Sequence, residues 1–322
     1  MTKIKTAIIG AAGYTGAELV RLLVHHPYCE LVCLYSSSQK GKRIDELHGD
    51  LIGDCDLRFT DVIPHSELDA VFLCLPHGEA TSFLNQHSFS ESTVLIDLST
   101  DFRNESAGFV YGLPEVNAHK VKTAKRIANP GCFATAIQLA LAPAIQKNWV
   151  QAPIHVTGVT GSTGAGKSLI ETSHFSYRTN NLSVYKLFNH QHLQEIKQTF
   201  QQLNPEAKEE ILFVPYRGNF SRGIWVTAYF PFTGTKEMAI NCYKEFYSQA
   251  EFTHVKEGEL DLKQVINTNK CLLSLQVQNG QLIIYSAIDN LLKGASGQAI
   301  QNFNLAFGLE EKMGLNLKSV VF

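Results

Sequence analysis

The chain has 322 residues, of which 44% are hydrophobic and 18% charged, and its formal net charge is −2. This is the composition of a globular protein long enough for about two domains. The near-neutral charge argues against nucleic acid or a membrane surface as a partner, and no apolar run approaches the roughly 18 residues of a membrane span.

The seven cysteines are scattered, and no two have the C-x-x-C spacing of a metal knuckle. An odd number of scattered cysteines is typical of a reduced, cytoplasmic protein. The apolar stretch near the N-terminus is short and runs into a glycine turn, which favours a buried first strand over a signal peptide. We therefore expect a cytoplasmic protein without a metal site.

The first part of the chain alternates apolar strands with helical patterns. Strands are predicted at 5–11, 29–37, 69–76 and 92–99, and a helix at 17–26. Strands that alternate with helices predict βαβ crossovers and a parallel sheet covered on both faces. The fold class is therefore α/β, with a Rossmann-type domain first.

A glycine-rich turn, "GAAGYTG", joins the first strand to the first helix. Its spacing, G-x-x-G-x-x-G, is close to the dinucleotide fingerprint, in which glycines permit a tight turn and a close approach of the pyrophosphate. Thr15 and Glu18 have the spacing of a capping box, which predicts a helix start near Thr15. The expected cofactor contacts are Gly10, Gly13, Tyr14, Thr15 and Gly16.

The end of the second strand indicates which dinucleotide binds. An NAD site has an acidic residue there for the ribose hydroxyl, whereas this chain continues "SSSQKGKR". Hydroxyls and cations suit a 2′-phosphate, so NADP is the predicted cofactor. Its expected contacts are Ser36, Ser38, Lys40 and Arg43.

One cysteine has a chemical context. Cys132 follows the turn "NPG" and opens an amphipathic helix, where the helix dipole favours a thiolate. A thiolate nucleophile also needs an acid or base, and "FNHQHLQEI" offers His190 and His192 with Glu195 one turn later. From the residues alone, a structural cysteine at a helix start is an equal alternative.

The pattern of apolar and polar residues changes after about residue 150. Longer strands with alternating patterns are predicted at 154–160, 210–217, 223–232, 271–278 and 281–289, before a last helical pattern at 297–310. They predict a second, α+β domain with a more antiparallel sheet.

The segment "GSTGAGKS" (161–168) fits the phosphate-loop pattern G-x-x-x-x-G-K-[ST]. A phosphate-loop enzyme, however, needs a long helix after the lysine, and the residues that follow Lys167 have no helical period. ATP binding is therefore not expected.

A nicotinamide cofactor with a cysteine nucleophile predicts hydride exchange at a carbon bonded to sulfur. With these features, the chain resembles the N-acetyl-γ-glutamyl-phosphate reductase family of arginine biosynthesis. The motifs that carry the resemblance span nearly the whole chain and include "DLSTDFR" (97–103), "YGLPEVN" (111–117), "NPGCFAT" (129–135), "HQHLQEI" (190–196) and "DNLLKGASGQAIQNFNLAFG" (289–308). Two positions depart from the family pattern: Gln191 replaces an arginine, and Tyr216 stands where histidine is common.

The resemblance implies NADPH-dependent reduction of an acyl phosphate to a semialdehyde, with Cys132 as nucleophile and phosphate released. It implies an acid/base histidine in "HQH", for which His192 is preferred and His190 is the alternative. It further implies a cofactor domain of residues 1–131 plus about 298–322, a catalytic and oligomerisation domain of 132–297, and a homodimer or homotetramer. The remaining implied contacts are Lys293, Gly294 and Gln298 for the cofactor, and Arg103, Asn129, Ser162, Gly164, Gly166 and Glu195 for the substrate.

Other functions fit the same motifs less well. Aspartate-semialdehyde dehydrogenase shares the chemistry, but "YGLPE" and "NPGC" argue against it. The motifs do not clearly distinguish the N-acetyl-γ-glutamyl-phosphate reductase family from a reductase whose glutamyl or aminoadipyl phosphate is linked to a carrier protein. A regulator that senses NADP is the non-enzymatic alternative, and it predicts an unreactive Cys132.

Overall fold

The computed structural model describes residues 2–320 and forms two compact units. The first unit comprises residues 2–130 and 295–316, and the second comprises residues 131–294 and 317–320. No helix among residues 2–320 is long and apolar enough to cross a membrane.

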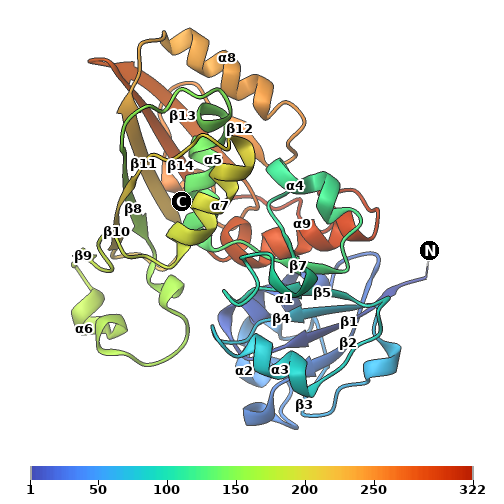
Figure 1. Cartoon of the computed structure of the whole chain (residues 1–322). Coiled ribbons are helices and arrows are strands. Elements are labelled where there is room, and N and C mark those ends of the chain that lie inside the picture. The colour runs from blue at the N-terminus through green and yellow to red at the C-terminus, as the bar shows by residue number, and fades with distance from the viewer. Residues whose placement is uncertain (1, 321–322) are drawn as a thin grey trace. The chain divides into compact units, whose positions relative to one another are not determined.

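The first unit has a parallel sheet whose strand order, within the described residues, is β3-β2-β1-β4-β5-β7-β6 (Figure 1). Every neighbouring pair in it is parallel. This is the expected Rossmann-type sheet, in which β1 lies between β2 and β4 and the crossovers run outward from this pair of neighbours on both sides. Its strands are β1 (Ile4–Ile9), β2 (Cys29–Tyr35), β3 (Phe59–Thr60), β4 (Ala70–Leu73), β5 (Val94–Asp97), β6 (Val110–Tyr111) and β7 (Arg126–Ala128).

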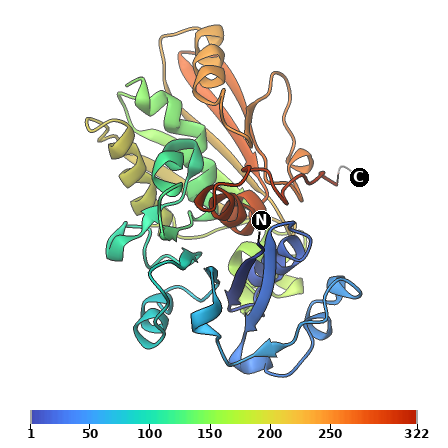
Figure 2. The same cartoon turned by 90° about the vertical axis from the view of Figure 1, so that its right-hand side faces the viewer.

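Helices from both ends of the chain pack on this sheet. The last helix, α9, contacts α1, α4 and β5, so residues nearly 300 positions apart share one unit (Figure 2). The helices of the first unit are α1 (Tyr14–Leu23), α2 (Ile44–Leu47), α3 (Ala80–Gln86), α4 (Pro114–Val121) and α9 (Gly297–Ala306).

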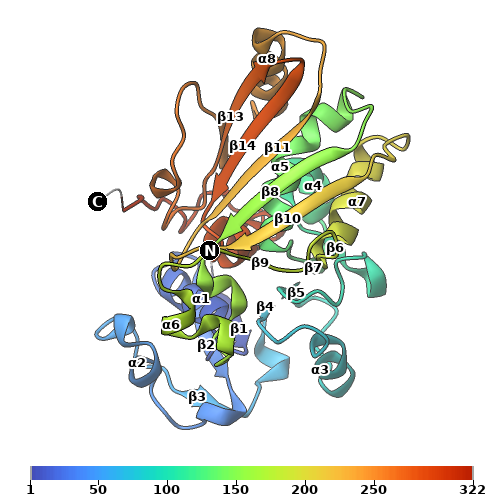
Figure 3. The same cartoon turned by 90° about the vertical axis from the view of Figure 1, so that its left-hand side faces the viewer.

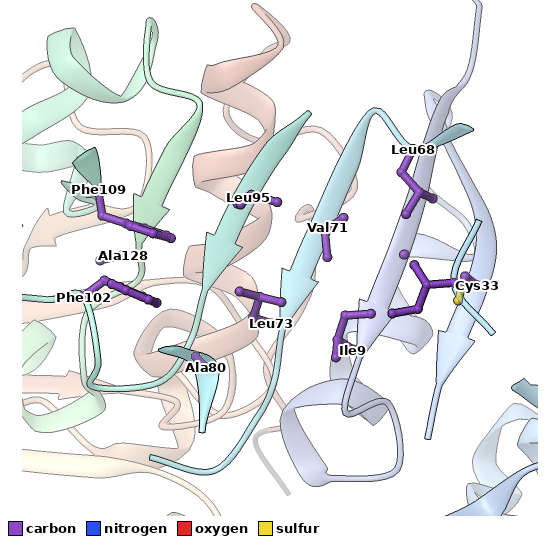
Figure 4. Packing of buried hydrophobic residues seen from close by; sticks show 12 residues of the cluster. Ile9, Cys33, Leu68, Val71, Leu73, Ala80, Leu95, Phe102, Phe109 and Ala128 are labelled. Carbon is purple, nitrogen blue, oxygen red and sulfur yellow. The ribbon is translucent and has the colours of Figure 1, made fainter. Parts of the chain in front are cut away.

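A buried cluster on one side of the first sheet shows why its strands are almost wholly apolar (Figure 4). Val71 and Leu73 are two residues apart on β4, so both point to this side, and Ile9 and Leu95 extend the row to the neighbouring strands. Because helices cover the opposite side as well, the residues between them must also be apolar. The sheet therefore holds the ends of β1, β2 and β5 in a rigid array.

The second unit has a mixed sheet with the order β12-β13-β14-β11-β8-β10-β9 among the described residues. The pairs β8–β10 and β12–β13 are parallel, and the others are antiparallel. Its strands are β8 (Ile154–Thr160), β9 (Ser183–Val184), β10 (Ile211–Arg217), β11 (Ile224–Pro231), β12 (Thr253–Val255), β13 (Cys271–Gln278) and β14 (Gln281–Ile288). Its helices are α5 (Cys132–Gln146), α6 (Phe175–Arg178), α7 (His192–Leu203) and α8 (Lys236–Phe246).

Helices cover one face of this second sheet. The apolar helix α5 contacts β11, β13 and β14, α7 packs on α5, and α8 packs on β12 and β13. Buried and partly exposed residues alternate along β11, as expected for a strand covered on one side. The other face lies open toward the viewer in Figure 3, where no helix of the second unit, as far as it is described, crosses the central strands.

Candidate active site

The glycine turn of the first unit requires glycine at two of its positions. Gly10 has φ +82°, and a Cβ there would lie 2.5 Å from the carbonyl oxygen of Cys74. A Cβ on Gly16 would lie 2.6 Å from the Cα of Ala11. Side chains at these positions would separate β1 from β4 and from α1, so the turn brings bare backbone to the carboxyl edge of the sheet.

The predicted capping box is wrong. Helix α1 begins at Tyr14 with Gly13 as its N-cap, which makes Thr15 the second helical residue, and no described side chain caps the helix. Glu18 instead pairs with Arg21 at 2.7 Å. Because the N-cap is Gly13, two residues before Thr15, the first N–H groups of the helix are left uncapped beside Tyr14 and Thr15, which is the arrangement that binds phosphate.

In the polar loop after β2, the two predicted hydroxyls lie near each other, whereas the two predicted cations are paired with carboxylates. Ser36 is buried at the end of β2, and its hydroxyl lies 3.4 Å from that of Ser38. Lys40 forms an ion pair with Asp61 at 2.8 Å. Arg43 grips Asp45 with two bonds of 2.9 and 2.8 Å. Both predicted cations thus already have carboxylate partners, which a 2′-phosphate would have to share.

Gln298 lies in α9 and is fully buried. Neither its amide nitrogen nor its amide oxygen has a hydrogen-bond partner among the described residues. A buried primary amide without partners is costly, and a ligand that carries an amide would satisfy both ends. A nicotinamide carboxamide fits this requirement.

Arg103 and Asn129 belong to one buried network of the first unit. Arg103 donates from Nε to the carbonyl of Asn129 at 3.0 Å and from its terminal nitrogen to the carbonyl of Leu98 at 3.1 Å. The Asn129 amide donates to the carbonyl of Ala295 at 3.0 Å and accepts from Asn302 at 3.0 Å. The network fixes the turn that precedes Cys132.

Asp97 is a buried carboxyl at the end of β5. Burial raises its pKa to about 6, although the Ser99 hydroxyl donates to it at 2.7 Å and favours the charged form. A carboxyl held this way titrates near neutral pH, which is unusual for a purely structural residue.

In the second unit, Cys132 is the first residue of α5, and Gly131 is its N-cap without any capping side chain. A Cβ added to Gly294 would lie 2.8 Å from the Cβ of Cys132, so the two backbones meet closely at this position. The neighbouring Lys293 is fully buried, with its ammonium 5.9 Å from the centre of the Phe252 ring. The predicted nucleophile and the Lys293–Gly294 turn therefore lie together.

Glu195 ties the histidine motif to the start of α5. Its Oε2 accepts a hydrogen bond of 3.0 Å from the backbone N–H of Gly131. Its Oε1 lies 3.9 Å from Nε2 of His192, which is the first residue of α7 and is buried. Glu195 thus touches the residue before Cys132 and the imidazole of His192 at the same time.

His190 is held as a neutral imidazole. Its Nδ1 accepts from the backbone N–H of His192 at 3.2 Å, so a neutral ring carries its proton on Nε2. Burial, with a smaller effect from Lys186, lowers its pKa to about 4. Its ring contacts that of Phe133, the residue after Cys132, with the centroids 5.7 Å apart. At neutral pH His190 can donate from Nε2 but resists taking up a proton.

The loop of residues 161–166 is not a phosphate loop. It forms a 3₁₀ turn at Ser162–Ala165, and the next α-helix, α6, has only four residues. The N–H of Ser162 donates to Phe220, that of Gly164 to Gly161 and that of Gly166 to Thr163. These predicted substrate contacts are thus already satisfied through their backbones, and the Ser162 hydroxyl is the remaining donor.

Two segments of the second unit that are distant in sequence, residues 222–223 and 289–290, are joined by hydrogen bonds. Arg222 grips the fully buried Asp289 with bonds of 3.0 and 3.1 Å. The next residue, Gly223, donates to Asn290 at 2.7 Å, and Asn290 donates to Thr163 at 3.0 Å. Residues 222–223 and 289–290 therefore connect the turn before Lys293 to the loop that begins at Gly161.

The sequence reasoning missed two residues of this site, Tyr185 and Arg217. The Arg217 guanidinium lies over the Tyr185 ring at 4.9 Å, and that ring lies 5.8 Å from His190. Burial, then the nearby Cys132, raises the pKa of the Tyr185 phenol, which therefore keeps its proton. Tyr216 is the position where the sequence departs from the family pattern. Because neighbouring residues of a strand point to opposite faces, its side chain lies on the other face of β10 from that of Arg217.

Among residues 2–320, no three His, Cys, Asp or Glu side chains are grouped so that they could hold a metal ion. A dinucleotide turn in one unit and a helix-start cysteine with buried histidines in the other define the semialdehyde dehydrogenase class. Residues 5–124 match the family "Semialdehyde dehydrogenase, NAD binding domain", and residues 132–290 match "Semialdehyde dehydrogenase, dimerisation domain".

Curated relatives give the particular family. A protein of Christiangramia forsetii named N-acetyl-gamma-glutamyl-phosphate reductase is 56% identical over 99% of this chain and 100% of its own length. Proteins of the same name from Bacteroides thetaiotaomicron and Flavobacterium johnsoniae are both 49% identical, over 99% and 98% of this chain and 100% and 98% of their own lengths. The chain therefore belongs to the N-acetyl-gamma-glutamyl-phosphate reductase family.

Solved structures with the same fold are more distant in sequence. Aspartate semialdehyde dehydrogenase II of Vibrio cholerae, in complex with ASA, has a TM-score of 0.77 at 16% identity and covers 96% of this chain and 99% of its own. The Candida albicans enzyme with NADP has a TM-score of 0.71 at 16% identity, covering 94% and 98%. These likenesses establish the fold.

Proposed function

We propose that the chain reduces N-acetyl-L-glutamyl 5-phosphate to N-acetyl-L-glutamate 5-semialdehyde with NADPH and releases phosphate. The observation that carries the proposal is the position of Cys132 at the open start of α5, with Glu195 bonded to the preceding residue and reaching His192. The name shared by relatives that match the chain from end to end supplies the substrate.

In the proposed reaction the Cys132 thiolate attacks the γ-acyl carbon, and phosphate leaves. The uncapped start of α5 stabilises the thiolate and the negative charge that develops on the acyl oxygen. NADPH supplies the hydride that converts the thioester to a thiohemiacetal. Collapse of the thiohemiacetal releases the aldehyde and restores the thiolate.

We assign the proton transfer at the thiohemiacetal oxygen to His192, because the carboxylate of Glu195 lies 3.9 Å from its Nε2 and can orient the imidazole. His190 has a different part, since its low pKa keeps it neutral. Its Nε2–H is a fixed donor that supports the same oxygen. Glu195 is a positioning residue for both His192 and the start of α5.

The residues of the first unit fit an NADP molecule. The uncapped α1 receives the pyrophosphate, Ser36 and Ser38 offer hydroxyls to the 2′-phosphate, and the buried Gln298 amide accepts the carboxamide. Arg103 is the proposed phosphoryl ligand and Asn129 the residue that positions it. The remaining proposed contacts are Lys40 and Arg43 for the 2′-phosphate, Lys293 and Gly294 near the nicotinamide, and Ser162, Gly164 and Gly166 along the substrate.

The open face of the second sheet is the proposed interface with a second copy of the chain. It carries Trp225 and Tyr285, whose rings are 5.8 Å apart, and Tyr229 stacked on His155 at 4.9 Å. Aromatic side chains on a sheet face that no described helix covers favour a protein contact, and residues 132–290 match a dimerisation domain. We expect a homodimer or a pair of dimers, in the cytoplasm, where its seven free thiols stay reduced.

The reverse reaction tests the proposal. Purified protein is mixed with N-acetylglutamate 5-semialdehyde, NADP⁺ and phosphate, and NADPH is followed by absorbance. We expect NADPH formation that requires phosphate and is lost in Cys132→Ala. Turnover of aspartate semialdehyde in preference to the longer substrate would refute the assignment.

A further inference from the structure

We infer that Arg217, supported by Arg178, binds the α-carboxylate of the substrate and so determines which acyl phosphates the enzyme accepts. This rests on the proposed function, because it identifies the part of that substrate which the second unit recognises.

The direction of Arg217 follows from its strand. Side chains two residues apart on β10 share a face, so Arg217 points to the same side as Phe213. The Phe213 ring lies 5.1 Å from that of Phe133 and 5.5 Å from that of His190. Arg217 therefore continues the row of side chains that lines the catalytic residues.

Ring contacts connect the Arg217 guanidinium to the catalytic residues. The guanidinium lies 4.9 Å from the centre of the Tyr185 ring, the Tyr185 and His190 ring centres are 5.8 Å apart, and the His190 and Phe133 ring centres are 5.7 Å apart. The leaving phosphate is bonded to the carbon that Cys132 attacks, whereas three carbons separate that carbon from the α-carboxylate. We therefore assign Arg217, at the end of this row of rings, to the carboxylate.

The charge of these arginines is unbalanced. Arg178 is buried, donates to the carbonyl of Arg217 at 3.0 Å and to the Ser183 hydroxyl at 3.0 Å, and has an unbonded Nε. The Nε of Arg217 is also buried without a partner. Neither guanidinium pairs with a carboxylate in the part of the chain that the structure describes. A buried arginine such as Arg178 is normally paired, and a buried guanidinium nitrogen such as the Nε of Arg217 normally has a partner, so the two side chains together favour an anionic ligand.

Tyr185 completes the subsite. Burial raises the pKa of its phenol, which therefore keeps its proton at neutral pH, and the Arg217 guanidinium lies over its ring at 4.9 Å. The phenol can then donate to a carboxylate oxygen while the guanidinium supplies the charge. The planar fork of Arg217 matches a carboxylate with two parallel bonds, which an ammonium cannot do.

Two substrates and two variants test this inference. The reverse reaction is measured with N-acetylglutamate 5-semialdehyde and with its α-carboxamide, which has the same shape without the charge. For the wild type we expect the carboxamide to raise KM roughly 50-fold, the effect of losing a charge-assisted pair of bonds. Arg217→Met should raise KM for the carboxylate by a similar factor, leave KM for the carboxamide within about threefold, and change kcat little. Arg217→Lys, which keeps the charge, should recover part of the loss.

The matched control is Arg126→Met, an exposed arginine at the amino end of β7 that bonds to the carbonyl of Ala107. It should leave both KM values unchanged. An equal loss on both substrates in Arg217→Met would overturn the inference, as would no loss on either. A rise in KM for phosphate instead of the semialdehyde would assign Arg217 to the phosphoryl group and also overturn it.

A second measurement does not depend on turnover. N-acetyl-L-glutamate should protect Cys132 from iodoacetamide, and Arg217→Met should raise the half-protecting concentration roughly 50-fold while Arg126→Met does not. If the wild type turns over no semialdehyde, the proposed function fails, and protection that Arg217→Met leaves unchanged refutes the carboxylate subsite separately.

Discussion

Gly294 and Cys132 meet without room for a side chain, since a Cβ on Gly294 would lie 2.8 Å from the Cβ of Cys132. Gly294→Ala should therefore displace the nucleophile, and we expect kcat to fall by roughly 100-fold or more, because small misplacements of reacting groups are costly. The reverse assay with a thermal melt measures this. Gly49→Ala is the control, since nothing lies within 4 Å of a Cβ there, and full activity in Gly294→Ala would contradict the close approach.

The two histidines should separate in their pH dependence. The pKa of His190 is lowered to about 4, so below that pH its Nδ1 gains a proton and loses the bond from the His192 backbone. If His190 were the acid/base, the acidic limb of kcat/KM would fall near pH 4. We predict that His192→Asn abolishes the acidic limb, whereas His190→Asn lowers kcat and keeps that limb. The opposite pattern would exchange the two roles.

The ionised carboxylate of Asp97 should lower the free energy of unfolding at neutral pH. Its pKa is raised from 3.8 to about 6, so the folded chain holds a proton that the unfolded chain releases between those values. Stability therefore falls as pH rises through that window, by at most about 3 kcal/mol for a displacement of about two pH units.

Asp97→Asn removes this cost, because asparagine keeps the shape and carries no charge. We expect its urea midpoint to exceed that of the wild type at pH 7.5 and to equal it at pH 3.5. A variant that is less stable than the wild type at pH 7.5, where the carboxyl is ionised, but equal to it at pH 3.5 would show that the ionised carboxylate is needed in the fold.

The end of β2 should set the choice of dinucleotide. Ser36→Asp places a carboxylate where the 2′-phosphate of NADP would lie, so kcat/KM for NADPH should fall by roughly 100-fold by charge repulsion. The value for NADH should fall much less, and the ratio of the two is the readout. An unchanged preference for NADPH would place the 2′-phosphate away from Ser36.

Much of the fold is readable from the sequence. The predicted strand at 154–160 matches β8, the one at 271–278 matches β13, and the strands of the first part are β1, β2, β4 and β5 of a parallel sheet. These segments are apolar over their whole length or alternate strictly, and both patterns are strong signals. Strands β3, β6, β7, β9 and β12 were not predicted, because each has only two or three residues and owes its pairing to a neighbour.

Within the site, some contacts could not be predicted from the sequence, because they depend on how the chain folds. The spacing of Thr15 and Glu18 suggested a capping box, but the tight turn at Gly10 starts α1 at Tyr14 and leaves Thr15 inside the helix. The sequence does not mark Arg217, because Tyr185 and His190 are distant from it along the chain and come close only when the chain folds. The alternation of β10 directs Arg217 toward His190 and Tyr216 away from it.

In the proposed reaction Cys132 carries the acyl group during turnover. Intact-protein and peptide mass spectrometry detects this acyl group after the enzyme is mixed with the acyl phosphate in the absence of NADPH. We predict one N-acetylglutamyl adduct per chain, on the peptide that contains Cys132, which disappears when NADPH is added and never forms in Cys132→Ala. An adduct on another residue, or Cys132→Ala protein that still turns over, would contradict the account.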